Sequence, residues 1–450
     1  MLDLEKLLET EARQLPRYTS YPPANHFNAR DLTALNAKLR DAVVDADSLS
    51  VYLHVPFCDR LCWFCGCHTK HTLSYAPVAK YVDVLVQDIE NYAGLRTTPA
   101  HITKLHLGGG SPSLLKKPEL DKIRQALDKA FRIDGDTEIS VELDPSDLGP
   151  DSIQNLIGFG LTRASIGVQD FDPEIQKAIN RPQSFELTRD IVGQLRAAGV
   201  KSINIDALYG LPGQTSEKLS QTVAKVLSLS PDRISLFGYA HVPWVKPHQK
   251  MIDESTLPDQ RQRLHDAALA ASLITAAGYE AIGIDHFAKP EDNLAKFARE
   301  GKLKRNFQGY TDDHSEVLLG FGPSSISSFP DGFAQNQVAT GLYTAAVTAG
   351  QSPVARGLLL SDLDKRNGWI IERLMCDFAF TRQALLQSFG KGGEQAWQQA
   401  EMIATDNPDL CRISGDHFEM ENSARALVRL VASKFDTWLE ASAFQYSKAV

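Results

Sequence analysis

Between residues 49 and 239 one pattern repeats six times: a short β-branched run that ends in Gly, Pro or polar residues, then a stretch with helical spacing of apolar residues. The expected strands are 49–55, 102–108, 137–143, 163–169, 202–208 and 233–239. Helices are expected between them, as in "VAKYVDVLVQDIENYAG" and "KPELDKIRQALDKAF". Six βα units in series predict a parallel sheet with right-handed crossovers, either open or curled into a barrel.

The alternation of residues within these strands favours the barrel. In the first strand Val51, Leu53 and Val55 fall on one face, and Tyr52 and His54 fall on the other. The third, fourth and fifth strands also have one apolar and one polar face. A parallel sheet with helices on both sides should be apolar on both faces. We therefore expect a partial, six-stranded (β/α)6 barrel with a polar lumen, and we expect the ligand site in that lumen.

The rest of the sequence frames this barrel. Residues 1–48 are expected to form an N-terminal arm: a short amphipathic helix, then the extended segment "LPRYTSYPPANHF", whose prolines forbid helix. The barrel is expected to occupy 49–290. The βα rhythm is lost beyond about residue 290. Residues 291–450 are therefore expected to form a C-terminal domain, mainly helical from 360 to 445, that closes the barrel mouth.

The composition limits the possible partners. A chain of 450 residues, 43% apolar and 23% charged, has room for two or three domains. Its formal net charge of -9 disfavours nucleic-acid binding but permits a local basic pocket for a small acidic molecule. The start "MLDLEKLLETEARQ" is not an apolar signal, and no membrane span is found, so a cytoplasmic location is expected. Cys376 and Cys411 are far apart, which suits a reducing compartment.

The other four cysteines lie together in "YLHVPFCDRLCWFCGCHTK", directly after the first expected strand. Cys58, Cys62, Cys65 and Cys67 have the spacing C-x3-C-x2-C-x-C. Structural zinc sites usually pair two C-x2-C knuckles, and no second knuckle follows here, so zinc is disfavoured. Thiolates grouped on one loop favour an iron-sulfur cluster.

The C-x3-C-x2-C motif after the first strand resembles that of the radical S-adenosylmethionine superfamily. The resemblance implies a partial (β/α)6 barrel in which Cys58, Cys62 and Cys65 hold a 4Fe-4S cluster and leave one iron for the cofactor. Phe64 matches the aromatic residue that precedes the third cysteine. Cys67 is similar to a residue that is not a cluster ligand, so we expect it to have a supporting role.

A narrower resemblance, to the oxygen-independent coproporphyrinogen III oxidase (dehydrogenase) family, covers almost the whole chain. It is carried by nine blocks in order: "PRYTSYP", "YLHVPFCDRLCWFCGC", "GGGSPS", "VELDP", "GVQDF", "NIDALYGLPGQT", "GYAHVP", "GIDHFA" and "RNFQGYT". It implies a monomeric enzyme of haem and porphyrin biosynthesis, in which the N-terminal arm, residues 1–48, covers the active site. Such an enzyme converts two propionates of coproporphyrinogen III to vinyl groups through a 5'-deoxyadenosyl radical, giving protoporphyrinogen IX. Its electron donor would be a flavodoxin or ferredoxin-type protein.

The family pattern also implies two bound molecules of S-adenosylmethionine. The positions that match the cluster-bound molecule are Tyr52, Gly109 and Glu142, and Ile326 matches a position beside the adenosyl group. Those that match the second molecule are Gly110, Ser111, Gln169, Arg181, Asp206 and Ala240, and Phe64 is grouped with the cofactor residues. Tyr52, Glu142 and Arg17 are expected to take part in catalysis, Arg17 by meeting a propionate. Read without the family, Glu142 would be an ion-pair partner of a lumen Lys or Arg, and Arg181 a solvated surface charge.

Three other functions share some of these features. A haem chaperone of the same superfamily often has "GLPGQT", but it lacks the "PRYTSYP" arm and carries H-N-x-x-Y-W where this chain has "RNFQGYT". Another radical enzyme on the same scaffold, such as a methyltransferase or a cyclopropane-forming enzyme, would share the cluster and the barrel. A structural zinc-binding or partner-binding protein is the remaining alternative.

Overall fold

The computed structural model describes residues 15–439, and its centre is a 12-stranded sheet. Seven neighbouring strands of the sheet run parallel. In spatial order they are β13 (Leu318–Phe321), β1 (Ser48–Val55), β4 (His101–Gly109), β5 (Glu138–Leu143), β6 (Arg163–Gln169), β7 (Ser202–Tyr209) and β8 (Arg233–Gly238). The six strands expected from the sequence are all present, with ends that shift by at most one residue. The expected parallel α/β fold is confirmed.

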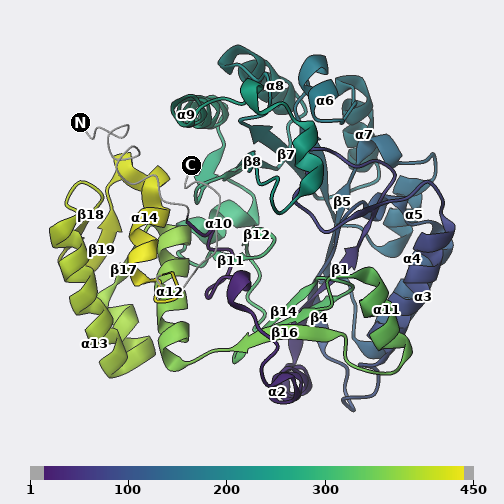
Figure 1. Cartoon of the computed structure of the whole chain (residues 1–450), viewed down its shortest axis with the longest axis horizontal. Helices are drawn as coiled ribbons and strands as arrows, with labels where there is room; N and C mark the ends of the chain where they lie inside the picture. The colour runs from purple at the N-terminus through teal and green to yellow at the C-terminus, as the bar shows by residue number, and fades with distance from the viewer. Residues whose placement is uncertain (1–14, 440–450) are drawn as a thin grey trace.

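Helices cover the outer face of this sheet (Figure 1). They are α3 (Ala76–Glu90), α4 (Lys117–Ala130), α5 (Ser152–Phe159), α6 (Pro173–Ala178), α7 (Phe185–Ala197), α8 (Ser216–Ser228) and α9 (Gln260–Ala276). Several begin at a side-chain cap: Ser184, Thr215 and Asp259 accept hydrogen bonds from backbone N–H groups at the starts of α7, α8 and α9. Alternate residues of β5 and β6 are buried under the helices, so the polar set faces the lumen as the alternation predicts.

The sheet does not end at residue 290, where the sequence pattern placed a boundary. Beyond β13 it continues through the antiparallel strands β14 (Ile326–Phe329), β15 (Gly332–Asn336) and β16 (Val354–Leu359). Its other edge carries β10 (His286–Ala288) and β9 (Glu280–Ile282). Leu319, Phe321 and Phe329 are buried in the same core as the barrel strands. The segment that follows residue 290 therefore contributes to the main core.

The remaining short elements link these parts. They are β2 (Phe57–Cys58), β3 (Lys70–His71), α10 (Asn293–Arg299), β11 (Lys304–Asn306), β12 (Gly309–Thr311) and α11 (Thr340–Thr348). The part of the chain that the structure describes has no helix both long enough and apolar enough to cross a membrane.

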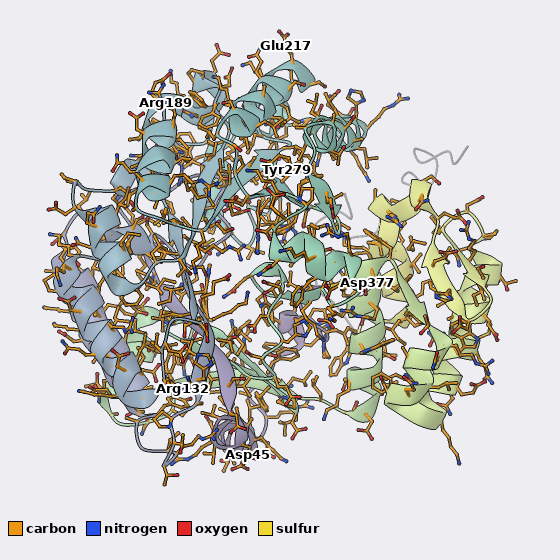
Figure 2. All side chains as sticks on the ribbon, turned by 180° about the vertical axis from the view of Figure 1, so that it is seen from behind. Asp45, Arg132, Arg189, Glu217, Tyr279 and Asp377 are labelled. Carbon is orange, nitrogen blue, oxygen red and sulfur yellow. The ribbon has the colours of Figure 1, made fainter. Side chains whose placement is uncertain are left out.

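A helical unit with its own core lies to one side of the sheet (Figure 1). It is built from α12 (Asp362–Asp377), α13 (Arg382–Asp406), α14 (Val428–Ala432) and a small sheet of β17 (Ala379–Thr381), β18 (Cys411–Ser414) and β19 (His417–Met420). Figure 2 marks Asp377 at the end of α12. There Arg373 donates to Asp377 at 2.5 Å and to the carbonyl oxygen of Gly301 at 3.1 Å, which ties the unit to the main body.

The N-terminal arm crosses between the two cores. Leu15, Tyr18 and Tyr21 are buried in the C-terminal core, and Tyr18 Oη donates to Asp436 Oδ2 at 3.0 Å. Asn28 then pairs with the β16 backbone, and α2 (Leu32–Asp45) leads into β1. The helix expected at the start of the sequence lies outside the described residues.

Candidate active site

The expected site residues follow the strand order of the sheet. From one side to the other they are Ile326 at the start of β14, Tyr52 on β1, Gly109 at the end of β4, Glu142 on β5, Gln169 at the end of β6, Asp206 on β7, and Ala240 just after β8. The carboxyl ends of parallel strands meet at one edge, and an antiparallel neighbour begins at that same edge. The topology therefore brings this widely spaced set of residues to one edge of the sheet.

A hydrogen-bonded network on the lumen face holds Glu142. One carboxylate oxygen, Oε1, is joined to His106 Nε2 at 3.2 Å, and Oε2 accepts from the backbone N–H of Gly109 at 3.0 Å. The His106 ring stacks on Tyr52, with ring centroids 5.8 Å apart and an interplanar angle of 14°. Tyr52 Oη is in turn joined to His54 Nδ1 at 3.0 Å. Both oxygens of the carboxylate are therefore fixed in position.

This environment keeps Glu142 ionised. Burial among lumen residues raises its pKa, but the hydrogen bond and positive charge offered by His106 and the Gly109 N–H outweigh burial, so the pKa lies below its ordinary value. The side chain is still 41% accessible from within the lumen. Its partner is a histidine and not the Lys or Arg that a plain ion pair would have used. An accessible, ionised carboxylate is suited to receive a cationic amino group.

The glycine turn after β4 is shaped by close contacts. Gly109 has φ +114°, and a Cβ there would lie 2.6 Å from the His54 ring. A Cβ on Gly110 would lie 2.5 Å from the carbonyl oxygen of Phe57. Neither position accepts a side chain without displacement of its neighbours. The turn is thus packed against the strand that leads into the cysteine loop.

Ser111 takes part in a hydrogen-bonded cluster that the sequence analysis missed. Its hydroxyl donates to Asp147 Oδ2, and Ser113 Oγ donates to Asp147 Oδ1 at 2.6 Å. Burial, and then the nearby charge of Asp144, raise the pKa of Asp147 to about 7. The spacing of the two serines in "GGGSPS" is the only sequence signal for this carboxylate.

Of the three cysteines of the motif, Cys58 ends β2, and Cys62 and Cys65 lie on the loop that joins β2 to β3; all are free thiols. Each sulfur has a hydrogen-bonding partner. Cys58 Sγ lies 2.9 Å from Thr69 Oγ1, and Cys65 Sγ accepts from the backbone N–H of Cys67 at 3.3 Å. Cys62 Sγ accepts from Arg181 Nη1 at 3.6 Å. Cys67 thus acts on the motif through the hydrogen bond that its backbone N–H donates to Cys65.

This set of three thiols suits an iron-sulfur cluster, whose irons take cysteine thiolates as ligands. Among residues 15–439 no group of three His, Cys, Asp or Glu side chains converges to hold one metal ion. A 4Fe-4S cluster binds each thiolate at a different iron, so its ligands need not converge on one point. Hydrogen bonds from Cys67 lower the pKa of Cys65 to about 7, whereas burial raises that of Cys58 to about 12. Cys58, Cys62 and Cys65 are the residues that could hold the cluster.

Arg181 is buried, contrary to the alternative of a solvated surface charge. It is 7% exposed and forms an ion pair of 2.8 Å with Asp144. It also donates to the carbonyl oxygen of Gly167 at 2.6 Å. Because the same guanidinium contacts Cys62, it connects the cysteine loop to the ends of β5 and β6.

The remaining residues expected to contact a cofactor fall into two groups. Asp206 lies in the lumen, where it accepts from Ser165 Oγ at 3.1 Å; burial, then the charge of Glu142, raise its pKa. Gln169 ends β6 with φ +69°. Phe64 and Ala240 are joined through Gln249 Nε2, which donates to both carbonyl oxygens, at 3.0 and 3.2 Å.

Arg17 is separated from this network and lines a cavity of about 740 Å³ beside the end of β8. Its Nη2 donates to the carbonyl oxygen of Gly238 at 3.1 Å. The composition permits a local basic pocket, but the sequence motifs point to only one of the five arginines that line it. No short motif could have identified the others, because they are far apart in the sequence.

Comparisons with known proteins agree with this geometry. The model of the Radical SAM superfamily matches residues 52–226, so the fold and the cysteine loop define a radical S-adenosylmethionine protein. An oxygen-independent coproporphyrinogen III oxidase of Cereibacter sphaeroides is 44% identical over 437 residues, covering 97% of this chain and 96% of the relative. One from Paracoccus denitrificans is 42% identical over 96% of each chain.

The structure of coproporphyrinogen III oxidase (HemN) from Escherichia coli is similar with a TM-score of 0.89 and 34% identity, covering 95% of this chain and 100% of that one. The chain belongs to the oxygen-independent coproporphyrinogen III oxidases. The haem-chaperone, methyltransferase and zinc-protein alternatives are set aside by this membership.

Proposed function

We propose that the protein converts coproporphyrinogen III to protoporphyrinogen IX without oxygen. Each of two propionates loses one hydrogen atom, one carbon dioxide and one electron, which leaves a vinyl group. The observation that carries this proposal is the convergence of a three-thiol loop, an ionised lumen carboxylate and the glycine turn at one edge of the sheet, in a chain of this family.

The cluster and S-adenosylmethionine, when bound, supply a 5'-deoxyadenosyl radical that abstracts the hydrogen atom. Cys58, Cys62 and Cys65 would hold the cluster. Glu142, fixed by His106 and Gly109, would orient the amino group of the cofactor. Tyr52, whose pKa burial and then Glu142 raise, stays neutral beside it. With substrate and cofactor bound, the lumen would keep bulk water away from these groups.

The finer assignments are also proposals. A second molecule of S-adenosylmethionine would use Arg181, Asp206 and the residues grouped with them, because Arg181 and Asp206 are charged groups held at the carboxyl edge of the sheet. A flavodoxin or ferredoxin-type protein would supply the electron to the cluster. The enzyme would act as a monomer.

Anaerobic turnover tests the function. Reconstituted, reduced protein is incubated with S-adenosylmethionine and coproporphyrinogen III, and protoporphyrin is measured by chromatography after oxidation. The expected result is protoporphyrin from the wild type and none from Cys62→Ala. Cys411→Ala, a buried cysteine of the C-terminal core, should behave as the wild type. Formation of 5'-deoxyadenosine without protoporphyrin would show that the substrate is a different molecule.

A further inference from the structure

The cavity of about 740 Å³ lies where β8, α9, the β9–β10 edge and the segment before α14 meet. Its volume falls within the range of roughly 300–1,000 Å³ typical of small-molecule sites. Ala240, expected at the cofactor, is part of its wall, so the cavity adjoins the candidate active site. Neither the cluster cysteines nor Glu142 line it.

The charge of this cavity is strongly one-sided. Five arginines line it, from the arm, α9, β11 and the last helical turns: Arg17, Arg263, Arg305, Arg425 and Arg429. Two lining carboxylates oppose them, Asp259 and Asp285. Asp259 Oδ1 accepts from the backbone N–H of Gln262 at 2.8 Å, at the start of α9, and Asp285 is paired with His286 at 2.7 Å. Five cations against two anions leave an excess of three positive charges.

Arg305 occupies a central position among these cations. Its Nη2 donates to the carbonyl oxygen of Arg17 at 3.4 Å, and its guanidinium lies 4.3 Å from the centroid of the Tyr310 ring. Its Nη1 is buried and has no hydrogen-bond partner within residues 15–439. A buried donor without a partner is costly, and an anionic ligand would satisfy it.

Arg429 is buried close to the positive charges of Arg17 and Arg305. It is 9% exposed. Burial, and then the charge of Arg17, lower its pKa to about 10. A carboxylate placed among Arg17, Arg305 and Arg429 would relieve this repulsion.

Part of the cavity lining is apolar and made of small residues. Ala267, Ala268 and Ala271 present small side chains from α9, and aromatic residues lie nearby, among them Phe237 and Trp244. Small residues on a helix leave room for a broad ring to lie against the backbone, and aromatic walls favour such a ring. The cavity thus combines a surface for a macrocycle with a rim for several carboxylates.

We propose that this cavity binds the macrocyclic substrate through its carboxylates, with Arg305 and Arg429 holding those that are not being converted. The ring lies along the alanine face of α9, and the reacting propionate points toward the lumen that carries Glu142. This inference rests on the proposed function, since a tetracarboxylate of porphyrinogen size is the ligand that both the charge and the volume fit.

The test uses coproporphyrin III, the oxidised and unreactive ring, as a fluorescent probe of the reconstituted enzyme. Arg305→Met and Arg429→Met are each expected to weaken its binding at least tenfold. Arg412→Met is the matched control, because Arg412 pairs with Glu419 and Glu421 outside the cavity. The tetramethyl ester of the probe should bind the wild type weakly and should not distinguish the variants.

Selective loss of the acid over the ester supports the cavity, even if a variant is less stable, because misfolding would weaken both probes. Equal affinity for coproporphyrin III in wild type, Arg305→Met and Arg429→Met would overturn the inference, as would equal weakening of both probes. Protoporphyrin formation by the wild type is measured in parallel. If the enzyme turns over but the arginine substitutions do not change probe binding, the proposed function stands and the cavity assignment fails. If probe binding is selective but no protoporphyrin forms, the cavity assignment stands and the proposed function fails.

Discussion

At the scale of single residues, the site depends on how Glu142 is held. A carboxylate with two fixed hydrogen bonds offers its remaining lone pairs in a defined direction, and it loses no rotamer entropy when it receives a cation. His106 and Gly109, both on the neighbouring strand β4, provide these two hydrogen bonds. The position of the Glu142 carboxylate is therefore set by the sheet before any ligand arrives.

Replacing Glu142 should remove that orientation while leaving the fold intact. We expect Glu142→Gln to reduce 5'-deoxyadenosine formation about 100-fold, the scale of losing one preorganised charged contact, and to weaken binding of S-adenosylmethionine. Both are measured with the reconstituted, reduced enzyme. Glu138→Gln is the control, since Glu138 lies on the same face of β5 but pairs with Lys104 and Arg163. Equal effects from both substitutions would contradict the role given to Glu142.

At the scale of elements, the turn that ends β4 combines backbone strain with close packing. Gly109→Ala should cost about 1–2 kcal/mol of stability through its left-handed backbone and should also displace His54, since the new Cβ would meet the His54 ring. Gly278→Ala is a matched control: Gly278 has φ +92° but open space around it. Thermal unfolding should show a loss in both variants. Only Gly109→Ala should lose turnover, and turnover equal to that of the control would refute this account of the turn.

A buried acid, Asp88 of α3, lies where this helix packs against α11. Asp88 accepts from Tyr343 Oη of α11 at 2.6 Å, and burial raises its pKa to about 7 from 3.8. Between about pH 4 and pH 7 the unfolded chain ionises before the folded one does, so this group lowers stability as pH rises through that window. Above pH 7 the cost is constant.

Asp88→Asn should abolish this slope. At pH 8 we expect the variant to be more stable than the wild type by up to about 4 kcal/mol, and the difference should shrink toward pH 4. Urea unfolding at pH 5, 6.5 and 8 measures it. An unchanged pH dependence in the variant would show that Asp88 ionises normally in the folded protein.

The secondary-structure elements were the part of this structure most predictable from the sequence. The six strands could be placed because alternation, β-branched residues and flanking glycines are local signals. β13 could not, because "LLGF" is only four residues long and no βα unit surrounds it; its place beside β1 is set by packing of Leu319 and Phe321 in the main core. His106 lies on the polar face of an expected strand, yet only the neighbouring strand reveals its partner Glu142.

At the scale of the whole molecule, the N-terminal arm joins the sheet to the C-terminal helices. Tyr18 and Tyr21 are buried in the C-terminal core, and both hydroxyls bond to the last described turns, at Asp436 and Thr437. The cavity beyond them was not predictable, because its arginines come from segments as far apart as residues 17 and 429 and only the folded chain collects them.

Removing the two arm tyrosines should separate the two cores. Tyr18→Ala with Tyr21→Ala should cost about 3–5 kcal/mol for each large buried side chain, so the C-terminal helices should unfold at lower urea than the sheet, giving two transitions by circular dichroism. Tyr18→Phe with Tyr21→Phe loses only the hydrogen bonds, about 1 kcal/mol each, and should unfold in one. A single transition at the wild-type midpoint for the alanine pair would show that the arm does not couple the cores.

The joining of Arg17 and Arg429 in one cavity has a consequence for how the protein is made. A ribosome adds roughly 5–20 residues per second, and the N-terminal part of the chain emerges first. The parallel sheet can form once β13 has emerged, but the carboxylate-binding rim must wait for another hundred or so residues of synthesis. A chain cut short in that interval would carry the cysteine loop and the lumen without the wall that recognises a substrate. Recognition of the macrocyclic substrate in this cavity is thereby confined to chains completed at least as far as Arg429.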